Sequence, residues 1–230
     1  MNDTSINSVA PPIKVAHAAR VVSITLLLLA IVTLYGVNAS SRLFPASSDT
    51  IYLLVTAIVS LLSLCCLRFS NRVQAHYAIA VSAVALLMLA AMQIFEPPKG
   101  DSAMLTSIWA QVFFLSRPVA LGLAIAALVG YLFQTKRIDA RLDSHCHLLS
   151  LLAGTAFLAG EIAGSYWAFI GWGRSWSWSG HFFFSALTYL LFILVFHLPK
   201  AWFPNARALA MGRAAVLGFI SLLMLGYRVL

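Results

Sequence analysis

Long apolar runs separated by short polar segments dominate the chain. Most runs approach about 20 residues, the length that an α-helix needs to cross the hydrocarbon core of a bilayer. Segments such as ITLLLLAIV and YLLFILVF do not alternate between polar and apolar residues, which argues against the strands of a membrane barrel. The pattern predicts an all-α fold, a polytopic transmembrane helical bundle of about seven spans.

The seven predicted spans share a high content of aliphatic and aromatic residues. They run approximately over residues 21–37, 51–67, 77–95, 119–133, 148–170, 182–198 and 208–230. The fourth span can extend backwards to Ile108, because the segment 108–115 is also apolar. Residues 1–20 are predicted to form a mobile N-terminal tail, and residues 21–230 a single transmembrane domain.

The amino-acid composition agrees with a helical membrane protein and excludes two other classes of protein. Hydrophobic residues make up 61% of the 230 residues, and charged residues make up 10%. An ordinary soluble domain has about 25% charged residues, so a water-soluble globular fold is excluded. The same figures exclude a disordered chain, which needs low hydrophobicity and high charge. The formal net charge of +8 is read as a membrane-sidedness bias and not as nucleic-acid binding.

The basic residues divide unequally if the N-terminus is placed inside. Ten then lie on the inner side, namely Lys14, Arg20, Arg68, Arg72, Lys136, Arg137, Arg141, Lys200, Arg207 and Arg213. Five lie on the outer side, namely Arg42, Lys99, Arg117, Arg174 and Arg228. The positive-inside rule therefore predicts an inner N-terminus and an outer C-terminus, with outer loops at 38–50, 96–118 and 171–181.

The cysteines predict neither a disulfide framework nor covalently attached haem. Cys65 and Cys66 are adjacent, Cys146 stands alone, and no CxxC or CxxCH motif occurs. The run His145-Cys146-His147 could ligate a metal, although three adjacent side chains do not easily reach one ion. Ordinary interfacial roles are the alternative for this run.

Three further histidines lie near the ends of predicted spans. His76 opens the third span, His197 closes the sixth, and His181 lies where the sixth begins. Two histidines from different spans could ligate a haem iron from both sides. Separate structural roles are the alternative, because a histidine near a helix end can also hydrogen-bond locally.

Four of the six tryptophans lie within the segment WAFIGWGRSWSWSGH, residues 167–181. One interpretation is an aromatic belt at the outer membrane interface. A second interpretation has equal weight, because the indoles are dense and are separated by serines and by Gly171, Gly173 and Gly180. Such a segment offers flat aromatic surface and hydroxyls to a planar apolar ligand with polar edges.

The tryptophan segment resembles the WWD signature of the haem-handling cytochrome c assembly family, of the CcsA, ResC and CcmC type. The family pattern is G-x-x-W-A, a short gap, W-G-x-x-W-x-W-D, and a span that ends in Leu/Phe-His. This chain reads GSYWA at 164–168, WGRSWSWS at 172–179 and FHL at 196–198. The upstream segment LDSHCHLLSLLAG is similar to the family's approach to this span. The resemblance covers residues 80–230 and is strongest over 140–200.

This resemblance implies a membrane protein of cytochrome c biogenesis that presents haem b on an outer tryptophan loop. It implies other membrane subunits of a cytochrome c assembly or respiratory complex as partners, and apocytochrome c, with no nucleic acid. The implied place is the bacterial inner membrane, with the tryptophan loop facing outward. No catalytic side chain is implied on this chain, because the chemistry lies in positioning the haem. The resemblance and the histidines described above together give the candidate haem-binding residues Trp167, Trp172, Gly173, Arg174, Trp176, Trp178, His181, His197 and His76. His197, which matches a family position, and His181, which does not, are the candidate iron ligands.

Several positions depart from the family pattern. The acid that ends the signature is replaced by Ser179, the first outer histidine by Phe113, and the first membrane histidine by Leu87. The second outer histidine would lie beyond the last span, past Leu230. Among the family's ligand positions, only that of His197 is matched.

Two hypotheses follow, because a six-coordinate haem iron needs two axial ligands. In the first, His181 and the pair His76 and His197 replace the missing ligands. In the second, the chain is a divergent, non-catalytic membrane subunit or regulator. It would keep the fold and dock other membrane proteins without delivering haem.

Glu161 lies in the middle of the fifth predicted span. A charged group there costs at least about 2.5 kcal/mol on insertion scales. Gly160 and Gly164 have GxxxG spacing, which predicts the close approach of another helix. We expect Glu161, Gly160 and Gly164 to contact a partner subunit, or Glu161 to be proton-linked. The alternative is a neutral glutamic acid bonded to backbone. Arg174 is a candidate for a haem propionate or a lipid headgroup.

Overall fold

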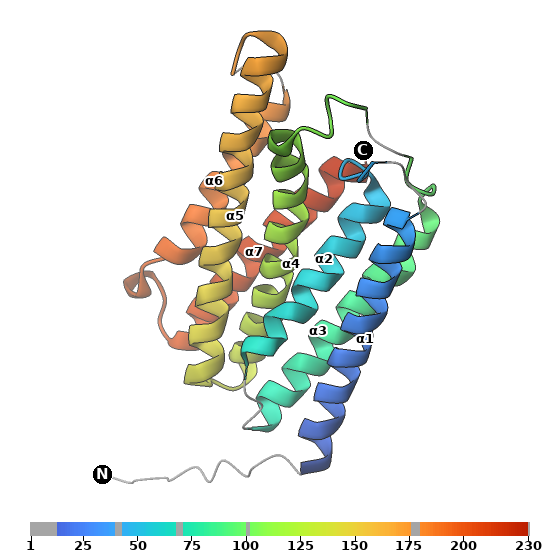
Figure 1. Cartoon of the computed structure of the whole chain (residues 1–230). Helices are drawn as coiled ribbons and strands as arrows, with labels where there is room; N and C mark the ends of the chain where they lie inside the picture. Colours follow the sequence, from blue (N-terminus) through green and yellow to red (C-terminus); the bar gives the residue numbers. More distant parts are fainter. Residues whose placement is uncertain (1–12, 40–42, 68–70, 100–101, 176–179, 230) are drawn as a thin grey trace, which may run out of the picture.

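A computed structural model describes residues 13–39, 43–67, 71–99, 102–175 and 180–229, which form helices and no strand. The α-helices are α1 (Ile13–Ala39), α2 (Asp49–Ser63), α3 (Arg72–Ala91), α4 (Ile108–Lys136), α5 (Ala140–Trp172), α6 (Gly180–His197) and α7 (Ala206–Val229). Short 3-10 helices are η1 (Leu64–Cys66), η2 (Met92–Ile94) and η3 (Lys200–Trp202). The predicted all-α bundle is confirmed for the described residues (Figure 1).

Six of the described helices are long and apolar enough to cross a membrane. They are Val15–Ala39, Asp49–Cys66, Arg72–Ile94, Ile108–Lys136, Ala140–Trp172 and Ala206–Arg228. The apolar part of α6, Phe182–His197, is shorter. However, α6 carries the chain from the end of α5 to the start of α7, which lie toward opposite ends of the bundle (Figure 1). These features indicate a multi-pass membrane protein, while the count of seven spans and their orientation stay predictions.

Helix α4 is the centre of the bundle. It packs against α2, α3, α5 and α7, whereas α1 packs on α2 and α3, and α6 packs on α5 and α7. The extended start of this helix at Ile108 is confirmed, so the predicted outer loop 96–118 is shortened and residues 108–118 are helical. Its buried stripe is rich in small residues, including Ala120, Ala124 and Ala127. Small residues let helix backbones approach closely, and close packing is what holds membrane helices together.

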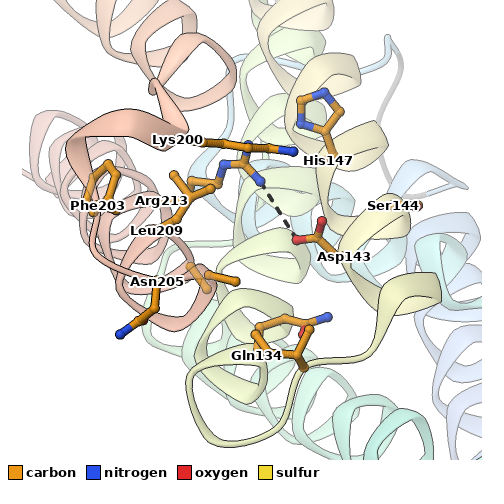
Figure 2. A pocket seen from close by; sticks show the side chains of 12 residues that line it. Gln134, Asp143, Ser144, His147, Lys200, Phe203, Asn205, Leu209 and Arg213 are labelled. Atoms are coloured by element: carbon orange, nitrogen blue, oxygen red, sulfur yellow. Dashed lines mark ion pairs between the residues drawn. The ribbon is translucent and has the colours of Figure 1, made fainter. Parts of the chain in front are cut away.

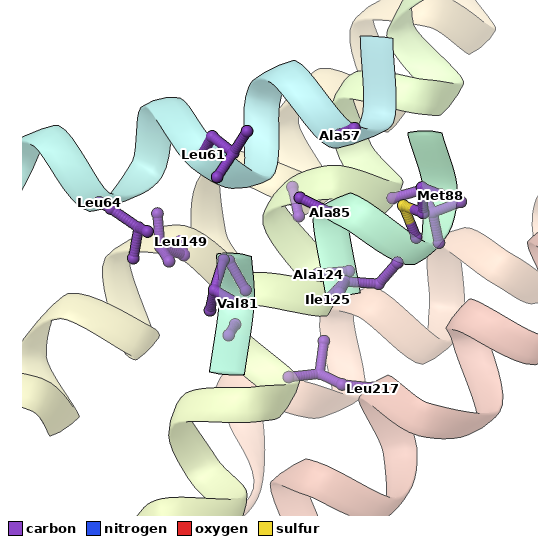
Figure 3. Close-up of a cluster of buried hydrophobic side chains, with 14 of the residues drawn as sticks. Ala57, Leu61, Leu64, Val81, Ala85, Met88, Ala124, Ile125, Leu149 and Leu217 are labelled. Atoms are coloured by element: carbon purple, nitrogen blue, oxygen red, sulfur yellow. The ribbon is translucent and has the colours of Figure 1, made fainter. Parts of the chain in front are cut away.

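The core lies where α2, α3, α4, α5 and α7 meet. Figure 3 shows part of this core, with Leu61, Val81, Ala124, Leu149 and Leu217 drawn from those five helices. The largest fully buried aromatic side chains are Tyr77, Tyr131 and Phe192. Many side chains on the outer surface are also large and apolar, which suits a lipid environment.

The crossing of α2 and α4 depends on Gly122. A Cβ atom at this position would lie 2.7 Å from the Thr56 carbonyl oxygen and 3.0 Å from the Val59 Cβ. The Ser60 hydroxyl donates a hydrogen bond to the Gly122 carbonyl, over 3.0 Å. The two backbones are therefore in direct contact, and any side chain at residue 122 would push them apart.

A polar junction around Asp139 ties the start of α3, the end of α4 and the start of α5 together. The Asp139 carboxylate caps α5 by accepting from the Leu142 N–H at 2.8 Å, and it also accepts from the Gln74 and Asn71 amides. The Gln134 side chain bonds both the N–H and the carbonyl of Asp139, over 2.8 and 2.7 Å. Burial raises the pKa of Asp139, but the hydrogen bonds that its carboxylate accepts outweigh this effect, so the pKa lies below its ordinary value.

We predict that Gly122→Ala destabilises the bundle by about 1–3 kcal/mol, because the new methyl group overpacks the α2–α4 crossing. Thermal unfolding of the purified protein in detergent measures the effect. Gly226→Ala in α7 is the matched control, since a Cβ there meets nothing within 4 Å. A Gly122→Ala variant as stable as Gly226→Ala would contradict the observed crossing.

We predict that Asp139→Asn lowers the unfolding temperature at neutral pH, because the charged form makes the stronger hydrogen bonds. A carboxylate with a lowered pKa contributes stability above its unfolded pKa of about 4, and loses it as the pH falls through the folded pKa. The difference from wild type should therefore begin to shrink below about pH 4 and disappear once the pH lies below the folded pKa. Glu96→Gln, which changes an exposed carboxylate, is the control. A constant difference at all pH values would show that the charge is not responsible.

Candidate functional site

The end of the bundle where α5 stops carries a group of packed aromatic side chains. This aromatic cluster consists of Trp167 with its ring contacts Phe113, Phe114 and Trp172, together with the nearby pair of Trp109 and Tyr166 from the same two helices, α4 and α5. The last turns of α5 reach beyond the ends of the neighbouring helices (Figure 1). The cluster therefore combines residues of the tryptophan segment with residues of a helix about 50 positions earlier.

Trp167 is the centre of the aromatic cluster. Its ring centroid lies 5.2 Å from that of Trp172 and 6.0 Å from those of Phe113 and Phe114. The Trp167 indole Nε1 is buried and has no hydrogen-bond partner among the described residues. Buried indole N–H groups usually find an acceptor, so this donor marks a place where a polar atom could bind.

The rim of the cluster is open. Trp172 is 57% exposed and Trp109 is 42% exposed. Trp109 also makes an edge contact with Tyr166, with 4.8 Å between ring centroids. The cluster thus presents indole surface outward while its centre is packed.

Gly173 ends α5, and this sets the direction in which the tryptophan segment leaves the helix. Its φ of +71° is left-handed, and its N–H donates to the Phe169 carbonyl at 2.9 Å. This is a common way to end a helix, and glycine adopts the conformation without strain. Gly173 therefore has a structural role next to the exposed Arg174. Trp176, Trp178 and Ser179 lie outside the described residues, as does the side chain of His181.

The predicted histidine pair is not brought together. His76 is exposed on α3 and its Nδ1 bonds the Arg72 carbonyl, whereas His197 is exposed on α6 and bonds the Ile193 carbonyl. The two helices lie at opposite sides of the bundle (Figure 1). Each histidine is thus bonded within its own helix, and the structure does not bring the two together.

The run His145-Cys146-His147 does not converge on one point either. His145 and Cys146 are buried, and His147 is exposed. Successive residues of an α-helix point about 100° apart, which separates the three side chains. Over the residues that the structure describes, no group of three His, Cys, Asp or Glu side chains could hold a metal ion.

A cavity of about 210 Å³ lies beneath the aromatic cluster, between α2, α4, α5, α6 and α7. Its lining is Asp49, Tyr52, Phe113, Phe114, Arg117, Phe157, Phe184, Ser185, Thr188, Met224, Tyr227 and Arg228. Two ion pairs are associated with it. Arg117 pairs with Glu161 at 2.6 Å, and Arg228 pairs with Asp49 and donates to the Ser47 carbonyl. The cavity is smaller than the roughly 300–1,000 Å³ of ordinary ligand pockets. Its charged lining residues pair with one another, and we do not assign it a ligand.

Arg117 is the site residue that the sequence did not reveal. The charge pattern predicts an outer loop at this position, but Arg117 lies inside α4, with 14% of its side chain exposed. Its guanidinium covers the Phe113 ring at 3.7 Å and donates to the Phe113 carbonyl and the Ser185 hydroxyl. The sequence did contain a clue to this pair. An acid inside one span and an arginine at the edge of another avoid the cost of an unpaired buried charge when they pair with each other.

The expected partner-subunit contact through Glu161, Gly160 and Gly164 is corrected by this geometry. Glu161 is ion-paired within the chain. A Cβ on Gly160 would lie 1.7 Å from the Ser116 hydroxyl oxygen, and one on Gly164 would lie 2.1 Å from Phe113 Cδ2. The helix that approaches this GxxxG face is α4 of the same chain, so the face is already filled.

We predict that Arg117→Met and Glu161→Met each destabilise the protein by about 3–5 kcal/mol, because each leaves one buried charge without its partner. The double variant should recover much of that loss, since both charges are then gone. A double-mutant cycle of unfolding free energies in detergent measures the coupling. The exposed pair Lys99 and Glu96 is the control and should couple by less than about 1 kcal/mol. Additive single effects at Arg117 and Glu161 would contradict the pairing.

No protein-family model matches the chain, and no curated protein matches it significantly. The functional inference therefore depends on the geometry of the chain itself. That geometry places an aromatic cluster at the end of α4 and α5, above a cavity with paired charges.

Proposed function

We propose that this chain is a multi-pass membrane protein that presents a planar, apolar ligand of the haem class at the aromatic end of its bundle. The observation that carries the proposal is the aromatic cluster around Trp167, with the exposed indoles of Trp172 and Trp109 at its rim. The resemblance of residues 164–179 to the tryptophan-rich signature of cytochrome c assembly proteins supports the same function.

The aromatic cluster suits the porphyrin face of haem better than its iron. Exposed indole rings can stack on a flat macrocycle, and the exposed Arg174 can pair with a propionate. Phe113 occupies the position of the family's first outer histidine and packs on Trp167. The Tyr166 hydroxyl is the one group of the cluster with the chemistry to ligate iron. Otherwise an axial ligand must come from His181, whose side chain is not described, or from a partner.

The role of this chain in such a system is presentation. When bound, haem supplies the vinyl groups that proteins of this family join to cysteine thiols of an apocytochrome. Trp109, Trp167 and Trp172 would hold and orient the macrocycle, and the packed centre of the cluster would keep water from one face. The aromatic end is proposed to face the outer side of a bacterial inner membrane, since the described basic residues gather mainly at the opposite end.

A second function is favoured by Phe113. This ring packs beside Trp167, at the position where the family has a histidine, and the Arg117 guanidinium lies over the ring. A chain that has closed this position could use the same exposed aromatic surface to dock another membrane subunit, without delivering haem. Aromatic side chains at the centre of an exposed patch are typical anchors of protein interfaces.

We predict that haemin binds the purified protein, with a Soret band and quenching of tryptophan fluorescence. Trp172→Ala should weaken binding by about 5- to 30-fold, because a lost ring contact removes about 1–2 kcal/mol. Trp202→Ala is the matched control, since Trp202 is 72% exposed and lies in η3, away from the cluster. Tyr166→Phe and His181→Ala identify the axial ligand by a change in the Soret position.

Two outcomes separate the functions. Equal haemin affinities for wild type, Trp172→Ala and Trp202→Ala would remove the haem proposal. Docking would then be tested by co-purification of a defined membrane subunit from native membranes, and Trp172→Ala should release that subunit while Trp202→Ala retains it.

A further inference from the structure

A second and larger pocket lies at the opposite end of the bundle, where α5 and α7 begin. Its volume is about 560 Å³, and it is bordered by the end of α4, the first turns of α5, η3 and the first turns of α7. Figure 2 shows its polar side chains, with Arg213 and Lys200 on one wall and Asp143 and His147 on α5 opposite them. This size falls within the range of pockets that hold small ligands.

Arg213 is the buried polar group of this pocket. Only 10% of its side chain is exposed. Its Nε is buried and has no hydrogen-bond partner among the described residues. Its guanidinium lies over the Tyr131 ring, 5.5 Å from the centroid, in a cation–π contact that gives the Nε hydrogen no oxygen acceptor. A buried guanidinium donor without an acceptor is costly, so the pocket is arranged to receive one.

The pocket supplies less negative charge than Arg213 requires. The nearest carboxylate is that of Asp143, whose oxygen lies 3.8 Å from Arg213 Nη1, beyond hydrogen-bond distance. The Asp143 side chain is also half exposed, so water screens the pair. Lys200 lines the same pocket and brings a second permanent positive charge. Two cations therefore face one loosely paired acid.

The remaining lining is consistent with an anion. His147 is exposed and contributes an imidazole, and α7 begins at the pocket, with the positive end of its dipole toward it. Gln134 is not available, because its amide bonds the backbone of Asp139. The Asn205 side-chain oxygen is engaged as a helix cap, accepting from the Ala208 N–H, which leaves its Nδ2 amide as a donor. Arg213, Lys200 and His147 are therefore the main groups that would attract an anion, beside the half-exposed Asp143 carboxylate and the Ser144 hydroxyl that also line the pocket.

We propose that this pocket binds a phosphate group, with Arg213 as its principal ligand and Lys200 as its second. A guanidinium matches the oxygens of a phosphate with parallel N–H bonds, and a lysine contributes a mobile charge. The same chemistry would be supplied by a free phosphate anion or by the headgroup of an anionic phospholipid at the membrane surface. The site is separate from the aromatic cluster, and its test does not depend on haem.

The unfolding temperature of the full chain in a neutral detergent tests the proposal. Inorganic phosphate should raise it saturably above a chloride control of equal ionic strength, because a ligand that binds only the folded state stabilises it. Nanodiscs of phosphatidylglycerol, compared with phosphatidylcholine, test the headgroup. A rise with phosphate identifies a soluble anion, and a rise confined to phosphatidylglycerol identifies a lipid.

Three variants show where the effect arises. Lys200→Gln, which changes an exposed side chain and leaves the buried core intact, should weaken the response about tenfold in phosphate concentration. Arg213→Gln should abolish it. Arg207→Gln is the matched control, since Arg207 is exposed on the same helix and does not line the pocket. A response that is absent in wild type from both phosphate and phosphatidylglycerol overturns the proposal. So does an equal loss in Lys200→Gln and Arg207→Gln, because that result would reflect surface charge alone.

Discussion

The contact between α4 and α5 is the interaction on which the rest of the structure depends. Gly160 and Gly164 remove the side chains that would hold the helices apart, and Ser116 and Phe113 enter the space. The ion pair between Arg117 and Glu161 then closes the interface inside an apolar bundle. A buried pair of this kind is weak as a source of net stability, but it penalises every arrangement that leaves either charge unpaired. It therefore selects one register of α4 against α5.

That register determines what lies at both ends of the bundle. At one end it places Phe113 and Phe114 against Trp167, so that the tryptophan segment is supported by an earlier helix. At the other end two hydrogen bonds between the Gln134 side chain and the Asp139 backbone join the two helices. The first turn of α5, with Asp143, is thereby set opposite Arg213 of α7. The two candidate sites are separate in chemistry, but one helix pair positions both.

The two ends differ in the kind of ligand that they suit. The aromatic end offers flat apolar surface with few fixed charges outside the closed ion pairs, whereas the opposite end offers cations with an incomplete set of counter-charges. This polarity along the bundle agrees with the uneven distribution of basic residues along the chain. The smaller cavity shows that a cavity is not by itself a ligand site, because the charged side chains around it already form ion pairs with one another.

The sequence by itself determined the class of protein and the approximate centre of each α-helix, because twenty-residue apolar runs have few other physical solutions. It also determined that Glu161 needs a partner and that a helix approaches Gly160 and Gly164. It did not determine the start of α1, which begins at Ile13, inside the predicted mobile tail of residues 1–20. Only the tertiary structure decided that the partner of Glu161 is Arg117 and that the approaching helix is α4. Arg117 is distant from Glu161 in sequence, and helical periodicity in an apolar segment does not report the rotation of one span against another. For the same reason the sequence could not show that His76 and His197 lie apart, or that Arg213 and Lys200 line one pocket.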